Sequence, residues 1–211
     1  APDATPPETV TEEAATVSDL ASITVEEAAV EAPLSLNETR IRMVIAELEM
    51  ARVQTVVDLG CGDGKLLSRL MKEKQLTQLV GLDVSVRVLE IAAERLRLDR
   101  LPQRQRERIQ LLHGGLTYRD ARIEGFDAAT AIEVIEHLDE NRLVAFERVL
   151  FQCARPGLVI VTTPNVEYNI HYSFLPPGQF RHPDHRFEWT RAAFAAWGQR
   201  VATTFGYGVR F

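Results

Sequence analysis

The chain has 211 residues, 45% of them hydrophobic, so it is long enough for one α/β domain with a sizeable core and too short for two complete enzymatic domains. It has no apolar run of about 18 residues and no signal-peptide pattern at its start, so we expect neither a membrane span nor a secretory leader. Its two cysteines, Cys61 and Cys153, make no disulfide framework, and we expect a reducing, cytoplasmic location.

The formal net charge of −6 comes from the N-terminal segment. Residues 1–33 contain eight acidic residues and no Lys or Arg, which leaves 22 acidic against 24 basic residues, about +2, in residues 34–211. We interpret residues 1–33 as a flexible acidic linker or tail with one marginal helix near residues 25–30, and residues 34–211 as the folded domain. The first residue is not Met, so further sequence upstream is expected. The charge of the body neither excludes nor favours a polyanionic partner.

The predicted elements alternate between helix and strand. A capping-box spacing from Ser35 to Glu38 begins a helix of about 14 residues, whose apolar positions are Ile41, Val44, Ile45 and Leu48. Five strand candidates follow, at residues 55–59, 79–84, 109–113, 126–132 and 158–163. Apolar helical stretches separate most of them, at residues 66–71, 86–96 and 143–151. This order predicts an α/β fold with a mostly parallel, Rossmann-like sheet and helices on both faces.

The regular pattern stops after the fifth strand candidate. Residues 164–188 are rich in proline, aromatic residues and histidine, and so long an irregular segment is usually functional or disordered. Thr190 is the expected N-cap of a last helix, with Phe194, Trp197 and Val201 on one face, and residues 207–211 are predicted to form a last strand.

A glycine-rich loop predicts a cofactor site. The run Asp-Leu-Gly-Cys-Gly-Asp-Gly at residues 58–64 follows a predicted buried strand and opens a predicted helix. Gly60, Gly62 and Gly64 allow a tight turn and a close approach of the backbone to a ligand. Asp83 lies 25 residues after Asp58, at the end of the next strand, where nucleotide-binding βαβ units place a ribose-binding acid. The combination predicts a nucleotide-type cofactor rather than a turn without a ligand.

The order of residues in this loop resembles motif I of class I S-adenosylmethionine-dependent methyltransferases. The resemblance implies that Asp58 supports the amino-acid end of S-adenosylmethionine, that Asp83 binds its ribose hydroxyls, and that Gly115 and Leu116 lie beside the adenine. Class I methyltransferases usually close their sheet with two antiparallel strands, so this chain is expected to have a truncated edge. Binding of NAD is an alternative that the loop pattern disfavours.

Glu133, Glu136 and His137 follow the fourth strand candidate, at the edge of a parallel sheet where ligands collect. If a helical turn begins here, the three side chains project from one side and can hold a divalent cation, Mg²⁺ or Mn²⁺. The same pattern also resembles the segment after the fourth strand of small-molecule methyltransferases, including quinone-type O-methyltransferases, in which a metal is not automatically implied.

Two further motifs extend the resemblance. Asp-His-Arg-Phe-Glu-Trp-Thr-Arg at residues 184–191 and Thr-Pro-Asn at residues 163–165, together with Glu-Val-Ile-Glu-His at residues 133–137, resemble the small-RNA 3′-terminal 2′-O-methyltransferases. This family includes the plant microRNA methyltransferases and bacterial RNA-repair relatives, and the resemblance covers residues 34–211. It implies four metal ligands, which fall on Glu133, Glu136, His137 and His185. We choose His185 over His182 because it follows the matched Asp184.

The resemblance implies a metal-dependent transfer of a methyl group to the 2′-hydroxyl of the 3′-terminal nucleotide of RNA, in RNA repair or small-RNA end protection. The expected partners are an RNA 3′ end and an RNA-repair or RNA-processing protein. Residues considered for RNA contacts are Arg40, Arg100, Arg104, Arg106, Arg108, Tyr168, His171, Tyr172, Phe174, Phe180, Arg181, His182, Arg186 and Arg191. Two alternatives remain: a metal-independent O-methyltransferase acting on a quinol or phenol, which chelators would not inhibit, and a cofactor-binding interaction module inside a repair complex.

Overall fold

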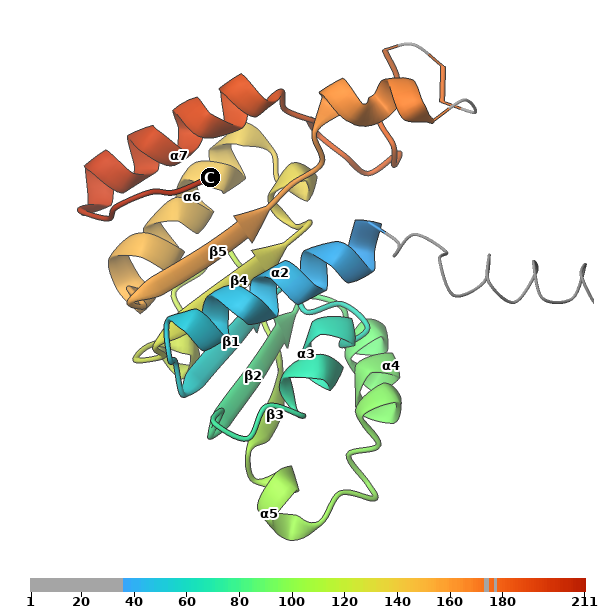
Figure 1. Ribbon diagram of the computed structural model, residues 1–211, viewed down its shortest axis with the longest axis vertical. Helices are drawn as coiled ribbons and strands as arrows, with labels where there is room; N and C mark the ends of the chain where they lie inside the picture. The colour runs from blue at the N-terminus through green and yellow to red at the C-terminus, as the bar shows by residue number, and fades with distance from the viewer. Residues whose placement is uncertain (1–35, 173–174, 177) are drawn as a thin grey trace, which may run out of the picture. The chain divides into compact units, whose positions relative to one another are not determined.

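The structure is a computed structural model that describes residues 36–172, 175–176 and 178–211 (Figure 1). The acidic segment 1–33, its expected helix and Ser35 of the capping box lie outside the described residues. Compact units divide between Arg40 and Ile41, and the unit from Ile41 to Phe211 contains the sheet and the candidate site. None of the described helices combines the length and the apolar character needed to cross a bilayer.

Five parallel strands form one sheet in the order β3-β2-β1-β4-β5. The strands are β1 (Thr55–Leu59), β2 (Gln78–Asp83), β3 (Ile109–His113), β4 (Ala128–Ile132) and β5 (Leu158–Thr162). Val57 on the central strand pairs in register with Val80 on β2 and with Ala129 on β4. The chain order reverses between β1 and β4, which is the switch point where open α/β sheets bind ligands outside the carboxyl ends of their strands.

Helices occur between the strands and after them. The α-helices are α2 (Leu36–Met50), α3 (Lys65–Leu70), α4 (Val86–Leu96), α5 (Gln103–Arg106), α6 (Glu140–Glu147) and α7 (Arg191–Phe205). A π-helical segment, η3 (Arg148–Ala154), continues α6, and three short 3-10 turns are η1 (Ala121–Ile123), η2 (Ile135–His137) and η4 (Val166–His171). The predicted alternation of strands and helices is therefore confirmed.

Each face of the sheet packs against its own set of helices. Val57 and Leu59 of β1 belong to a buried cluster that includes residues of α6, η3 and α7, whereas Val56 belongs to a second cluster with residues of α2, α3 and α4. Alternate residues of a strand point to opposite faces of the sheet, so neighbouring residues of β1 belong to different clusters. Both faces are covered, as expected for an all-parallel sheet.

The last helix is anchored at its start and along its length. Thr190 caps α7, with its side-chain oxygen 3.1 Å from the backbone nitrogen of Ala193, as the sequence predicts. The indole nitrogen of Trp197 donates a hydrogen bond of 2.8 Å to the buried carboxylate of Glu147 on α6, which Arg200 also contacts at 2.7 Å. The carboxylate is thus buried with its charge paired.

The prediction of a strand at residues 207–211 is wrong. The segment folds back against α7, where an added Cβ on Gly198 would lie 3.0 Å from the ring of Phe211. The hydroxyl of Tyr207 donates a hydrogen bond of 2.7 Å to the carbonyl oxygen of Pro156, before β5. Aromatic packing on the helix therefore replaces strand pairing, and β5 is the last strand at its side of the sheet.

Candidate active site

The glycine loop joins β1 to α3 at the carboxyl edge of the sheet. Gly60, Gly62 and Gly64 have φ angles of 72°, 54° and 75°, in the left-handed region that favours glycine. The backbone nitrogens of Gly60 and Cys61 lie 2.8 and 3.1 Å from the carbonyl oxygen of Leu82, so the loop turns tightly over the end of β2. The predicted loop geometry is confirmed.

Asp83 links three segments of this edge. Its carboxylate accepts hydrogen bonds from the backbone of Gly62 at 3.0 Å and of Ser85 at 2.9 Å. Its carbonyl oxygen accepts one of 3.0 Å from Gly114, which precedes Gly115 and Leu116 in the chain. The residues expected to contact the ribose and the adenine of the cofactor are therefore brought together with the glycine loop.

Asp58 is a buried acid beneath that loop. Its residue is 3% exposed, and Oδ1 accepts a hydrogen bond of 2.7 Å from the hydroxyl of Thr130. Burial raises the pKa of Asp58 to about 7, the hydrogen bond from Thr130 lowers it, and the neighbouring charge of Asp83 raises it further. A positive charge close to this carboxyl would favour its ionised form. The amino-acid end of a bound S-adenosylmethionine, which Asp58 is expected to support, carries such a charge.

The segment after β4 brings a carboxylate and an imidazole to the same edge. A single 3-10 turn, Ile135–His137, places Glu136 and His137 beside each other, and the fully buried Ile135 anchors the turn in the core. Glu133 lies outside the turn, with a left-handed φ of 56°. The expectation that one helical turn projects all three side chains from one side is therefore wrong for Glu133.

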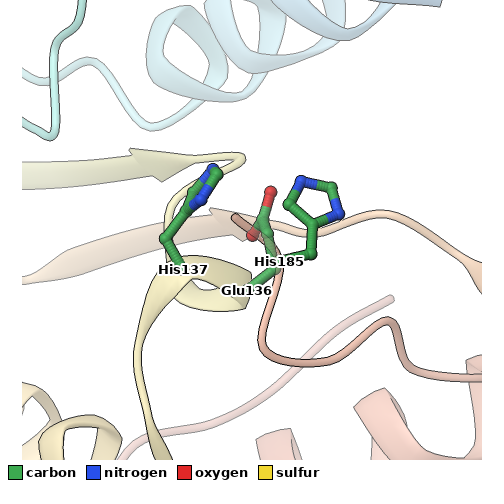
Figure 2. A group of neighbouring side chains, drawn as sticks. All are labelled: Glu136, His137 and His185. Carbon is green, nitrogen blue, oxygen red and sulfur yellow. The ribbon is translucent and has the colours of Figure 1, made fainter. Parts of the chain in front are cut away.

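His185 joins this turn from a segment 48 residues further along the chain. The backbone nitrogen of Arg186 donates a hydrogen bond of 2.7 Å to the carbonyl oxygen of Glu136. One ligand atom from each of Glu136, His137 and His185 lies within 4.8 Å of the others, and Figure 2 shows the three side chains converging. The ring centroids of the two histidines are 4.9 Å apart. Of the four expected ligands, the structure gathers these three.

Glu133, His182 and His113 do not belong to the gathered group. The carboxylate of Glu133 accepts a hydrogen bond of 2.9 Å from the hydroxyl of Thr162 and is not in the gathered group. His182 has its ring centroid 6.0 Å from that of His137. The Nε2 atom of His113 lies 3.0 Å from the carbonyl oxygen of Val84, so this ring packs beside the cofactor loops.

The donor set fits a divalent cation. It combines a buried carboxylate, Glu136 at 0% exposure, with two imidazoles, and such mixed sets suit Mn²⁺ or a later transition metal. The carboxylate is held by the hydroxyl of Thr163, 3.1 Å from Oε2. Burial, followed by the repulsion of His185, lowers the pKa of His137, which favours the neutral imidazole that ligates metals.

Glu188 is a site residue for which the sequence predicts no role. Its side chain is fully buried and contacts His185, Asn169 and the backbone of Arg181. Burial would raise the pKa of Glu188, but the hydrogen bonds from Asn169, Arg181 and His185 lower it below its ordinary value. Its position in the motif at residues 184–191, three residues after His185, was the only sequence feature that could have indicated it.

The sequence and the fold of this chain are similar to those of known methyltransferases. Residues 57–159 match the model of a methyltransferase domain. A crystal structure of the methyltransferase domain of bacterial CtHen1-CN is 56% identical, with a TM-score of 0.77, and the match covers 83% of this chain and 89% of that one. A structure of the small RNA methyltransferase HEN1 is 30% identical with a TM-score of 0.74, over 97% of this chain and 24% of that one. The chain belongs to the small-RNA 2′-O-methyltransferase family.

Curated members of the small-RNA 2′-O-methyltransferase family are longer proteins. That of Gallus gallus is 41% identical over 162 residues, which are 74% of this chain and 42% of the relative. That of Arabidopsis thaliana is 30% identical over 190 residues, which are 83% of this chain and 20% of the relative. The chain therefore spans less than half the length of these two relatives. An S-adenosylmethionine-dependent methyltransferase from Clostridium acetobutylicum, 15% identical with a TM-score of 0.51, shares the fold.

Most of the residues considered for RNA contacts lie either at the amino ends or at the carboxyl ends of the strands. Arg100, Arg104, Arg106 and Arg108 lie in or beside α5, which precedes β3 at the amino ends of the strands (Figure 1), whereas the turn with Glu136 and His137 follows β4 at the carboxyl ends. Arg181 and Arg186 lie in the segment that carries His185, and the nearby Tyr168 and Phe180 are 46% and 42% exposed. Phe174 lies outside the described residues, and Arg40 belongs to the other compact unit.

Proposed function

We propose that this domain transfers a methyl group from S-adenosylmethionine to the 2′-hydroxyl of the 3′-terminal nucleotide of RNA, with a divalent cation held by Glu136, His137 and His185. Glu133 would complete the ligand set once its carboxylate turns away from Thr162. The family members named small RNA 2′-O-methyltransferases support RNA as the substrate, and the chemistry of the clustered side chains supports the cation. A role in RNA repair or small-RNA end protection, beside a partner protein, is part of the proposal.

The proposal rests most directly on how closely two segments of the site are packed. An added Cβ on Gly60 of the cofactor loop would lie 2.7 Å from the side chain of Val134, the residue just before the turn that holds Glu136 and His137. The loop expected to bind the methyl donor therefore packs directly on the segment expected to bind the cation. This packing supports a reaction in which the donor methyl group and the acceptor hydroxyl meet at one point.

The chemistry requires activation of a weakly acidic hydroxyl. A divalent cation bound here would supply Lewis acidity, which would lower the pKa of a contacting hydroxyl. Glu136 and the two imidazoles would hold the 3′-terminal ribose in place through that ion, which raises the frequency of productive alignment. The 2′-oxygen then forms a bond to the methyl carbon as the carbon–sulfur bond breaks. The hydroxyl proton passes to water, because the imidazoles of His137 and His185 would be occupied by the cation, and the sulfonium becomes a neutral thioether.

The test uses radiolabelled S-adenosylmethionine and three matched RNAs, which end in a 2′,3′-diol, a 2′-deoxy sugar or a 3′-phosphate. Each is incubated with and without added Mn²⁺ after treatment of the protein with a chelator. We expect label only in the RNA with the free diol and only with Mn²⁺, because a cation held by Glu136, His137 and His185 would act on an unblocked terminal ribose, and a 2′-deoxy sugar has no acceptor oxygen. A quinol or phenol is offered in a parallel reaction, and its labelling in the presence of a chelator would instead establish the metal-independent alternative. No labelling of any RNA would overturn the proposal.

A further inference from the structure

The carboxylate of Glu188 lies directly against the ring of His185. Its Oε1 atom is 2.7 Å from Nδ1 of His185 and 2.6 Å from the backbone nitrogen of Arg181. Its Oε2 atom is 2.6 Å from Nδ2 of Asn169. The Glu188 side chain is 0% exposed and that of His185 is 8% exposed, so solvent does not compete strongly for these contacts.

The direction of each hydrogen bond in this network follows from Arg181, whose guanidinium can only donate. Its Nε donates to Oδ1 of Asn169 at 2.6 Å, and its Nη2 donates to the carbonyl oxygen of Asn165. Because Oδ1 of Asn169 is the acceptor, its Nδ2 must donate to Glu188. Glu188 therefore accepts from Asn169 and from a backbone N–H, and the remaining contact requires Nδ1 of His185 to carry a hydrogen.

We propose that Glu188 is a positioning residue, which holds His185 in the tautomer with hydrogen on Nδ1 and presents the bare Nε2 atom to the cation beside Glu136 and His137. A carboxylate behind a ligating histidine fixes the orientation of the ring and makes the ligating nitrogen more basic. Asn169 and Arg181 serve the same end, because they fix Glu188. The inference rests on the proposed function in one respect, since it takes His185 as a ligand.

This inference gives the irregular segment a specific task. Asn169 lies in η4 and Arg181 lies ten residues beyond its end, at a position with no regular secondary structure. The side-chain amide of Asn169 and the backbone N–H of Arg181 both donate to the buried carboxylate of Glu188, three residues after a candidate ligand. The segment thus fixes Glu188, and Glu188 in turn fixes the ring of His185. A buried network that only stabilises the fold does not require one particular tautomer of His185.

The tautomer can be measured without any metal. Long-range ¹⁵N–¹H correlation spectra of the metal-free protein, recorded where the ring is neutral, should show Nδ1 protonated and Nε2 bare for His185 in the wild type. In Glu188→Ala the ring should change toward the Nε2-protonated form that histidine prefers in water. The resonance is assigned with His185→Gln. A wild-type ring with hydrogen on Nε2, or an unchanged ring in the variant, would overturn the inference.

The effect on the cation is measured by titration of Mn²⁺ followed by electron paramagnetic resonance, without RNA. We expect Glu188→Ala to weaken Mn²⁺ binding by about 100-fold and Glu188→Gln, which keeps the shape but misplaces one donor, by about 10-fold. Glu167→Gln is the matched control, because Glu167 accepts a backbone hydrogen bond from Arg191 in the same region and has no contact with His185. It should bind Mn²⁺ like the wild type. S-adenosylmethionine affinity, measured by calorimetry, should stay unchanged in all three variants.

The outcomes separate this inference from the proposed function. If the wild type binds Mn²⁺ and both Glu188 variants bind it equally well, the inference is overturned and the proposed function stands. If the wild type binds no Mn²⁺, the proposed cation site is overturned, and the positioning role with it. If the variants lose Mn²⁺ and S-adenosylmethionine together, Glu188 has only a structural role and the inference is overturned.

Discussion

The backbone N–H of Arg186 donates a 2.7 Å hydrogen bond to the backbone carbonyl oxygen of Glu136, and this contact joins the two halves of the cation cluster. It places His185, the preceding residue, beside the turn that carries Glu136 and His137. The contact uses main-chain atoms only, so side-chain substitutions that leave the N–H in place should preserve it.

Replacement of Arg186 by proline removes this donor, because proline has no backbone N–H. We expect Arg186→Pro to lose roughly 1–3 kcal/mol of stability, the cost of a buried carbonyl without its partner. It should also weaken Mn²⁺ binding by about tenfold or more, since His185 loses its placement. Chemical denaturation and an Mn²⁺ titration measure the two effects.

Arg186→Ala is the matched control for this prediction. It keeps the N–H and removes only the ion pair with Asp139, whose atoms are 3.4 Å apart and whose side chains are both more than half exposed. Exposed pairs of this kind contribute about 0–1 kcal/mol. Equal loss of Mn²⁺ affinity in the alanine and proline variants would contradict the role assigned to the backbone contact.

Asp58 should make the stability of the protein without cofactor fall as the pH rises. Its pKa is about 7 in the folded chain against an ordinary value of 3.8, so between these pH values the folded state binds more protons than the unfolded state. Stability conferred by the protonated acid is therefore present at low pH and is lost as the pH rises toward 7. In Asp58→Asn the neutral amide removes this dependence. The stability advantage of the variant should grow by roughly 2–3 kcal/mol between pH 5 and pH 8.

The measurement is chemical denaturation, followed by circular dichroism, at several pH values. Asp127→Asn is the control, because backbone hydrogen bonds from Gln54 and Thr55 lower the pKa of Asp127 and keep this acid ionised throughout that range. Its difference from the wild type should stay constant between pH 5 and pH 8. An Asp58→Asn variant with the pH profile of the wild type would exclude Asp58 as the source. The Asp58→Asn variant should fail to bind S-adenosylmethionine at every pH.

The regular part of the fold could be predicted because its strands and helices are marked by local apolar patterns. Short, mostly apolar runs between helical stretches located all five strands to within about two residues, and Gly60, Gly62 and Gly64 marked the cofactor loop. Motif resemblance also identified Glu136, His137 and His185 as neighbours.

The features that could not be predicted depend on contacts between distant residues. The left-handed backbone of Glu133 is set by the junction between β4 and the turn, and no residue type in the sequence marks it. The last residues pack on α7 because Gly198 leaves room for Phe211, a fact invisible to strand periodicity. The role of Glu188 depends on Asn169 and Arg181, which share no regular spacing with it.

Gly60 should be far less tolerant of a side chain than another glycine with the same backbone conformation. An added Cβ at Gly60 would lie 2.7 Å from Cγ2 of Val134, and Gly60 has a φ of 72°. Gly125 has a φ of 82° and open space around the corresponding position. We expect Gly125→Ala to cost about 1–2 kcal/mol from its backbone alone. Gly60→Ala should cost more and should also weaken S-adenosylmethionine binding.

The double variant Gly60→Ala, Val134→Ala tests the cause of the additional loss. Valine has a restricted side-chain rotamer, so Val134 cannot easily move aside, and its truncation should restore part of the stability and of the cofactor affinity. Denaturation and calorimetric titration give the two values. Equal costs at Gly60 and Gly125 would show that the loop does not pack tightly on the segment before the cation cluster.

The arginines around α5 should contribute little to methylation of a short RNA. They lie at the amino edge of the sheet, opposite the cation cluster, and Arg100 pairs with its neighbour Asp99 at 3.5 Å. The guanidinium of Arg108 donates to the carbonyl oxygens of Glu73 and Leu76, at 2.9 Å for Glu73, so this residue stabilises the loop after α3. Arg108→Ala should therefore lower stability by roughly 1–3 kcal/mol, since partly buried carbonyls lose a charged donor, with kcat/KM unchanged in folded protein.

Arg104→Glu should change neither stability nor KM for a short RNA, because Arg104 is exposed and lies at the opposite ends of the strands from the cation cluster. A rise in KM that depends on salt concentration in Arg104→Glu would show that RNA extends across the molecule to this edge, since phosphate contacts are weakened by salt.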